Sequence, residues 1–185
     1  MRFKGRGLHG VRLIVSDACM GLAESAVEFF PEAAWQRCIV HWYRNVFSHV
    51  PSTKVREVAA MLKAIHAGED LVAARQQAVR VIEKLRGLRL TTAAELVETA
   101  VEETLAYYAF PEEHWRRIRT NNPLERILRE IRRRTRVVGA FPDGQSALNL
   151  AAARLRHIAG TAWSNKRYLN TELLKDQQMR GAITA

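Results

Sequence analysis

Cysteine and long apolar runs are scarce in this sequence of 185 residues, and each absence excludes a class of protein. The two cysteines, Cys19 and Cys38, are too few for a disulfide framework, so we expect a reducing, cytoplasmic location. No run reaches the ~18 consecutive apolar residues that a membrane span needs. The apolar stretch from Val11 to Val15 contains Arg12 and is too short for a signal peptide. We therefore expect no membrane association.

Glycine-rich loops, internal repeats and low-complexity segments are also missing. Gly5 and Gly7 precede the first expected strand, whereas a phosphate-binding loop would follow it. Hydrophobic residues make up 48% and charged residues 26%, a balance typical of a folded globular chain. The length suits one domain, or one domain with an insertion.

Positive charge is what the sequence has in excess. It holds 29 Lys and Arg against 19 Asp and Glu, a formal net charge of +10, with a pI near 10.3. Such a balance in a folded chain indicates a polyanionic partner, and DNA is the partner we expect.

The excess is concentrated between Arg116 and Arg136, where nine residues are Arg and none is Lys. Arg presents a planar donor fork that matches phosphate oxygens, which favours nucleic-acid contact over simple solubility. The alternative is a solvated helix face. The candidate DNA-binding residues are Arg116, Arg119, Arg126, Arg129, Arg132, Arg133 and Arg136.

The first fifty residues read as a strand–helix–strand–helix unit. Residues 11–17 and 34–40 are short runs typical of strands, with a helix expected over 21–30 and another over 41–50. A helix between two strands favours parallel pairing. The first strand, nearly continuously apolar, is predicted to be buried.

Residues 52–109 are neutral in charge, and their apolar residues recur at helical spacing. We predict three helices, over 52–67, 70–88 and 92–107. A short helix follows at Trp115, and then one that starts with Asn122 as N-cap and Glu125 as its capping-box partner. Leu124, Ile127 and Leu128 are expected to face the core. Asp143 is expected to cap a last long helix that ends near residue 158.

Helical spacing places Glu125 on the same face as Arg129, Arg132 and Arg136. Asp17 comes at the carboxyl end of the first strand, the edge of an open sheet where ligands bind. Each acid has a structural alternative: Asp17 as a turn or N-cap residue, and Glu125 as a capping residue. Cys38 and His41 have the spacing of zinc ligands, but no second close pair completes a structural site.

Four motifs in order resemble the bacterial Mutator-type transposases. They are the strand ending in Asp17, the stretch from Ala34 to His41, the segment around Asn122 and Glu125, and the run from Arg132 to Pro142. The resemblance extends from about residue 8 to about residue 170. An RNA-binding protein would account for the charge but not for the ordered motifs.

The resemblance implies a predominantly helical α/β fold, with an incomplete ribonuclease-H-like core and an all-helical insertion. The implied parts are a core segment at 1–50, the insertion at 51–112, core helices with the Glu and the Arg-rich face at 113–160, and a tail at 161–185. Asp17 and Glu125 match two of the family's three catalytic, metal-binding acids. Cys38, His41, Trp115 and Asn122 match supporting motif positions.

The implied activity is DNA cleavage and strand transfer with Mg²⁺ or Mn²⁺. The family's first Asp lies upstream of Asp17, and none of the sixteen residues before Asp17 is acidic. We therefore interpret the sequence as the C-terminal portion of a transposase and expect it to bind metal weakly and not to cut DNA alone. The alternative is a non-catalytic DNA-binding or dimerising remnant, whose partner would be another copy or a full-length transposase.

Overall fold

A computed structural model describes residues 4–161 and 169–175. The chain divides into two compact units, Met1–Thr120 and Asn121–Ala185, and each is described here by itself. The division falls inside the third segment that the sequence predicted, 113–160. Trp163, Tyr168 and most of the expected tail lie outside the described residues.

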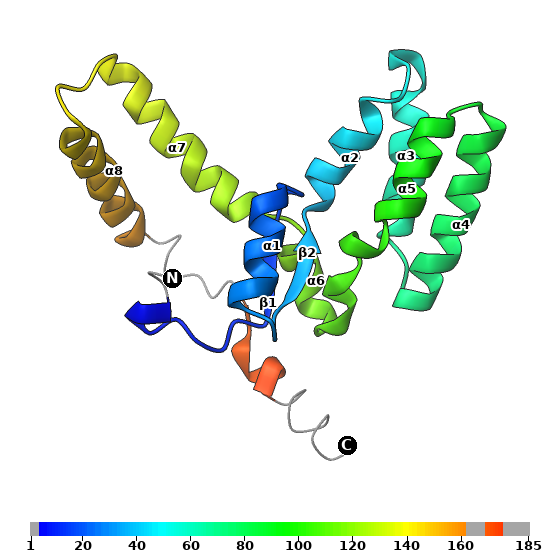
Figure 1. Ribbon diagram of the computed structural model, residues 1–185, viewed down its shortest axis with the longest axis horizontal. Coiled ribbons are helices and arrows are strands. Elements are labelled where there is room, and N and C mark those ends of the chain that lie inside the picture. Colours follow the sequence, from blue (N-terminus) through cyan, green and yellow to red (C-terminus); the bar gives the residue numbers. More distant parts are fainter. Residues whose placement is uncertain (1–3, 162–168, 176–185) are drawn as a thin grey trace. The chain divides into compact units, whose positions relative to one another are not determined.

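The first unit begins with a short 3₁₀ helix (Lys4–Arg6) and then a parallel pair of strands, β1 (Leu13–Ser16) and β2 (Ala34–Arg37), joined by helix α1 (Met20–Phe29). Leu13 pairs with Ala34 and Ser16 with Arg37, so both strands end at the same edge. α1 packs against both strands (Figure 1). The predicted parallel unit is found, and β1 and β2 are the strands of the sheet in the described part of the chain.

The strands differ from expectation in burial and in length. Residues Leu13 to Val15 are half-buried rather than buried, because among the described residues β1 has a strand neighbour on one side, β2. β2 ends at Arg37, and α2 (Ile39–Phe47) starts earlier than predicted. Cys38 is the junction: its N–H still donates across the strand pair to the Ser16 carbonyl at 2.7 Å, while its carbonyl already accepts the first helical bond, from Trp42 N at 3.0 Å.

The rest of the first unit is helical. It comprises η2 (Ser52–Lys54), α3 (Val55–Ile65), α4 (Leu71–Gly87), α5 (Thr91–Ala100), η3 (Glu102–Thr104), η4 (Ala106–Ala109) and α6 (Glu112–Ile118). α4 lies beside both α3 and α5 (Figure 1). We call α2 to α5 the helical module. Its core contains fully buried Trp42, Leu62, Ile65 and Leu85.

One predicted helix is broken. Residues 92–107 were expected to be continuous, but α5 ends at Ala100 and two 3₁₀ turns follow. In those turns the Tyr107 N–H donates to the side-chain oxygen of Gln36 at 2.9 Å, and the Thr104 hydroxyl donates to the Val101 carbonyl at 2.6 Å. A partner from β2 thus replaces a helical hydrogen bond, which no local pattern reveals.

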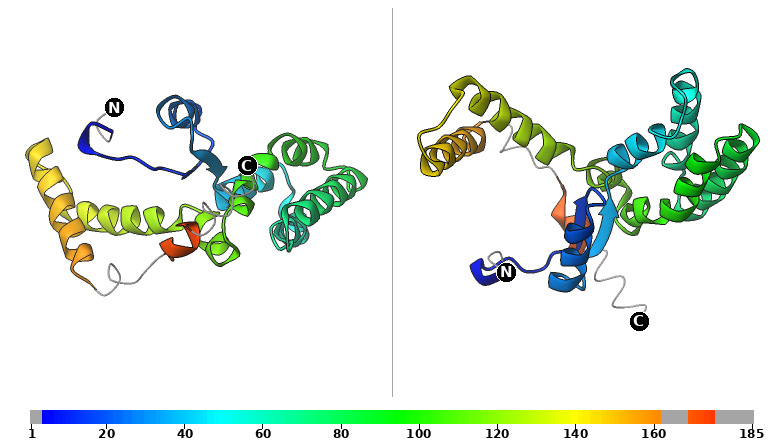
Figure 2. Two further views of the ribbon diagram at one scale, coloured as in Figure 1. Left: turned by 90° about the horizontal axis from the view of Figure 1, so that it is seen from below. Right: turned by 45° about the horizontal axis from the view of Figure 1, so that its top comes forward.

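The second unit contains α7 (Asn122–Val138) and α8 (Gly144–Ala159). The two helices contact each other and meet at an angle (Figure 2). Neither contains a buried residue. Leu124, expected to face a core, is 53% exposed, and Ile127 and Leu128 are half-buried. Asp143 caps α8 as predicted, accepting from Ser146 N at 2.6 Å.

Candidate functional site

Asp17 stands at the shared carboxyl edge of β1 and β2. It directly follows Ser16, and its side chain is exposed. One carboxylate oxygen accepts from Ala18 N at 2.8 Å, as in a turn. No hydrogen bond is recorded among the described residues for the other oxygen. The turn interpretation of Asp17 and a ligand role are therefore compatible.

Cys38 and His41 lie beside this edge, at the start of α2. Cys38 is the N-cap residue and is fully buried, and His41 is half-buried one helical turn further on. The His41 Nδ1 atom is buried and has no hydrogen-bond partner among the described residues. Over residues 4–161 and 169–175, no three His, Cys, Asp or Glu side chains form a group that could hold a metal ion. The zinc alternative therefore finds no further ligands in the described parts of the chain.

Glu125 lies in the first turn of α7. The helix begins one residue earlier than predicted: Asn121, not Asn122, is the N-cap, and its side chain makes no capping hydrogen bond. The capping-box prediction is thus wrong, because the turn closes through Glu125 N and the Asn121 carbonyl, at 3.1 Å, which moves Glu125 past the capping-box position. Asn122 becomes the first helical residue. Capping therefore no longer explains the Glu125 carboxylate.

The predicted shared face on α7 is found. A shallow depression is lined by Glu125, Arg129, Arg132, Arg133 and Arg136. Arg129, Arg132 and Arg136 are exposed, and no ion pair is recorded for them within the described residues. We call this surface the basic face. Half-buried Glu125 is the acid among its four Arg side chains.

Glu130 organises a separate set of ion pairs on α7 and α8. Its carboxylate contacts Arg133 at 2.9 Å and Arg154 at 2.5 Å. The hydrogen bond from Arg133, with the charges of Arg133, Arg154 and Arg134, lowers the pKa of Glu130 to about 2. Arg154 comes from α8, so the cluster links the two helices. Arg126 is exposed and lines a second hollow together with Arg154 and His157.

Arg119 and Trp115, both in the first unit, have structural contacts. The Arg119 guanidinium donates to the His66 carbonyl at 2.9 Å, and its own carbonyl accepts from Ile39 N at 3.2 Å. The Trp115 indole donates to the Phe110 carbonyl at 2.6 Å, and its ring meets that of Tyr108 edge-on. Arg116 is exposed on α6.

Asp17 belongs to the first unit and Glu125 to the second, so their convergence on one metal site stays a prediction. The sequence reasoning missed three buried polar residues: Gln36 in β2, and His66 and Thr104, which lie close to it. The signal available for Gln36 was a lone amide inside an otherwise strand-like run.

The comparisons with known proteins agree with the motifs. The family described as "Transposase, Mutator family" matches residues 1–164, and the chain belongs to this family. It is 39% identical over 180 residues to a protein named transposase for insertion sequence element IS1081 of Mycobacterium tuberculosis, covering 97% of this chain and 43% of that protein.

Two further relatives show the same relationship. The transposase for ISRM5 of Rhizobium meliloti is 37% identical, with 96% of this chain and 44% of the relative covered. The transposase for IS406 of Burkholderia multivorans is 38% identical, with 89% and 42% covered. The chain thus spans less than half the length of these relatives. None of the helices in the described part of the chain has the length and apolar character needed to cross a membrane.

Proposed function

We propose that this chain acts in DNA transposition, binding DNA through the basic face and contributing Asp17 and Glu125 to a divalent-metal site for DNA cleavage and strand transfer. The observation that carries the proposal is the basic face: four exposed Arg side chains line one depression with a carboxylate. Membership of the Mutator transposase family supports DNA as the partner.

The parallel β1–α1–β2 unit supports a further point, that these elements belong to a ribonuclease-H-like core. In such a core Asp17, at the carboxyl edge, is where a metal ligand is expected. The helical elements from η2 to η4 would then be the insertion at 51–112 that the family resemblance implies.

The donor atoms of Asp17 and Glu125 suit Mg²⁺ or Mn²⁺, because hard cations prefer carboxylate oxygen. Asp17 is exposed at a strand end, and Glu125 is half-buried. When bound, a pair of such ions would stabilise the attacking and leaving oxygens of a phosphoryl displacement. The four Arg side chains around Glu125 repel a bare cation but attract DNA phosphate, so we expect metal binding at Glu125 to strengthen when DNA is present.

The proposal is tested by the salt dependence of DNA binding. Replacing Arg129, Arg132 and Arg136 with Ala should reduce the slope of log K against log salt by roughly one unit per lost phosphate contact. The matched control replaces Arg75, Arg80 and Arg86 on α4 with Ala. These residues are also exposed, and their replacement removes the same amount of positive charge. The control variant should keep the wild-type slope. Equal slopes in the two triple variants would refute DNA binding through the basic face.

Cleavage is tested separately with a nicking and strand-transfer assay on element-end DNA. We expect no activity from this chain alone, because Asp17, Glu125 and one phosphate supply less negative charge than two divalent ions carry. A site that holds its ions about 1 Å out of place loses on the order of 10²-fold in rate. Metal-dependent cleavage that disappears in Glu125→Gln would contradict this expectation.

A further inference from the structure

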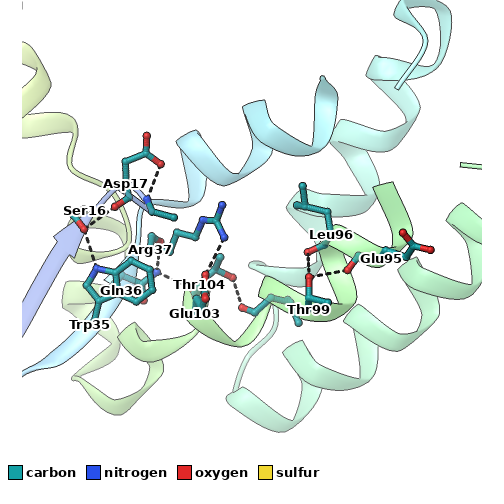
Figure 3. Close-up of polar contacts among 12 residues, drawn as sticks. Ser16, Asp17, Trp35, Gln36, Arg37, Glu95, Leu96, Thr99, Glu103 and Thr104 are labelled. Atoms are coloured by element: carbon teal, nitrogen blue, oxygen red, sulfur yellow. Dashed lines mark hydrogen bonds and ion pairs between the residues drawn. The ribbon is translucent and has the colours of Figure 1, made fainter. Parts of the chain in front are cut away.

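Gln36 is a fully buried amide in β2, and both polar atoms of its side chain have partners in the chain (Figure 3). Its nitrogen donates to the carbonyls of Arg37 at 2.7 Å and Thr104 at 2.8 Å. Its oxygen accepts from Tyr107 N at 2.9 Å. Two of these three bonds reach the 3₁₀ turns that follow α5. A buried amide with every partner present fixes one geometry, since any other leaves polar atoms unpaired.

These bonds continue into a set of polar contacts that we call the polar ring, formed by Gln36, His66, Thr104 and Arg119. Buried His66 contacts the Thr104 hydroxyl through Nε2 at 2.8 Å. Arg119 donates to the His66 carbonyl and accepts from Ile39 N, which returns the ring to the residue after Cys38. The polar ring therefore joins β2 and the start of α2 to the ends of α3, η3 and α6.

The proton positions in the ring follow from the donors available. Because the Thr104 hydroxyl donates to the Val101 carbonyl, His66 Nε2 must carry the hydrogen toward Thr104. His66 Nδ1 lies 2.9 Å from the Tyr43 hydroxyl, whose single hydrogen is shared with the Leu62 carbonyl at 3.2 Å. Burial lowers the pKa of His66, which favours the neutral ring, and the groups that face it are Tyr43, Thr104, Tyr107 and Arg119.

β2 also contacts the end of β1, where Asp17 lies. The Trp35 indole donates to the Ser16 hydroxyl at 2.8 Å, and that hydroxyl donates to the Asp17 carbonyl at 2.9 Å (Figure 3). Cys38 N also donates to the Ser16 carbonyl. A displacement of β2 would therefore move the backbone of Asp17.

We propose that Gln36 is a positioning residue: through the polar ring it fixes β2 against the helical module and so sets the affinity of Asp17 for a divalent cation. This inference rests on the proposed metal-binding role of Asp17. It assigns the helical module a part in forming the metal site. Removing residues that orient a metal ligand typically costs about 10–100-fold in metal affinity.

The test uses the whole chain, isotopically labelled, with Mn²⁺ as the probe. Bound Mn²⁺ broadens the amide signals of nearby residues, so the Ala18 signal reports occupancy at Asp17. The Gln36→Met variant keeps the approximate size of the side chain and loses all three hydrogen bonds. We expect its Mn²⁺ midpoint at Ala18 to rise about tenfold.

Two controls separate positioning from simple destabilisation. Leu85→Ala removes a fully buried side chain of α4 outside the polar ring, and should lower stability without moving the Mn²⁺ midpoint. Asp17→Asn should abolish the broadening. An unchanged midpoint in Gln36→Met, or an equal rise in Leu85→Ala, overturns the inference alone. Two results would overturn the proposed metal role and the inference with it. One is that Mn²⁺ does not broaden the Ala18 signal in the wild type, and the other is that the broadening persists in Asp17→Asn.

Discussion

The helical module and the α7–α8 unit are both helical but are stabilised in different ways. The module buries large side chains completely, among them Trp42, Leu62 and Leu85. α7 and α8 bury none, and Leu148 of α8 is 65% exposed. Their contacts are the Asp143 cap, the ion pairs of Glu130 and half-buried apolar side chains such as Ile127. The helical module therefore has a hydrophobic core, whereas α7 and α8 mainly present charged side chains at the surface.

This difference indicates how each region responds to substitution. Burial of apolar surface is the dominant favourable term in folding, whereas exposed ion pairs contribute little. Substitutions in the module should therefore act on stability, and substitutions on α7 should act on ligand binding.

Truncating Trp42 should have the largest effect. Its side chain is fully buried in the core of the helical module, so Trp42→Ala should cost about 3–5 kcal/mol of unfolding free energy. Urea unfolding followed by circular dichroism measures the loss. The comparison variant is Leu155→Ala on α8, where 45% of the residue is exposed and the expected change is small. Equal losses in the two variants would contradict the proposed division.

The second prediction concerns pH. Burial, assisted by the charge of Arg119, lowers the pKa of His66 from 6.5 to about 4. The unfolded chain binds a proton that the folded chain excludes, so stability from His66 is complete above pH 6.5 and is lost as the pH falls toward 4. The linkage amounts to about 3 kcal/mol.

The measurement is urea unfolding at several pH values between 4.5 and 7, in the wild type, His66→Gln and His157→Gln. His157 is exposed on α8 and serves as the control. Other groups titrate in the same range, so the informative quantity is the difference between variants. His66→Gln should flatten the pH dependence while His157→Gln keeps it; identical curves for the wild type and His66→Gln would disprove the assignment.

Two Arg residues from the same charge-rich stretch should behave in opposite ways. Arg119→Ala removes a charged donor from the buried His66 carbonyl and should cost about 1.5–3 kcal/mol of stability, with an unchanged salt slope for DNA binding. Arg132→Ala on the basic face should leave stability unchanged and reduce the slope by roughly one unit. Each variant loses one positive charge, so each controls for the other. Similar salt slopes in the two variants would contradict the assignment of a structural role to Arg119 and a DNA-binding role to Arg132.

The smallest effects concern two equivalent helix caps. Asp70 caps α4 by accepting from Ala73 N at 2.7 Å, and Asp143 caps α8 in the same way. Asp70→Ala should lower the unfolding free energy of the module by about 1 kcal/mol. Asp143→Ala should instead increase amide hydrogen exchange at the start of α8 and leave the module unchanged. A loss of module stability in Asp143→Ala would show that the two regions fold as one.

Several features were predictable because their causes lie within a few residues. Apolar spacing predicted the helices α3, α4, α7 and α8, and Asp70 and Asp143 marked two helix starts. The strand-like runs before Asp17 and Cys38 predicted the parallel pair. The spacing of Glu125, Arg129 and Arg132 predicted a shared face that the structure contains. Each of these depends on local geometry, which repeats at fixed intervals along the chain.

What the tertiary structure decided is which polar groups become buried and what they contact. The residues alone predicted most of the helices, both strands, the concentration of Arg and the family. It left Gln36 as an amide in a strand and Arg119 as one Arg among nine. The fold brings Gln36 to Thr104, 68 residues away, and Arg119 to His66, 53 residues away, so that α5 stops and 3₁₀ turns follow. A buried polar group needs a partner wherever the chain supplies one, and that partner is found only after the chain has folded.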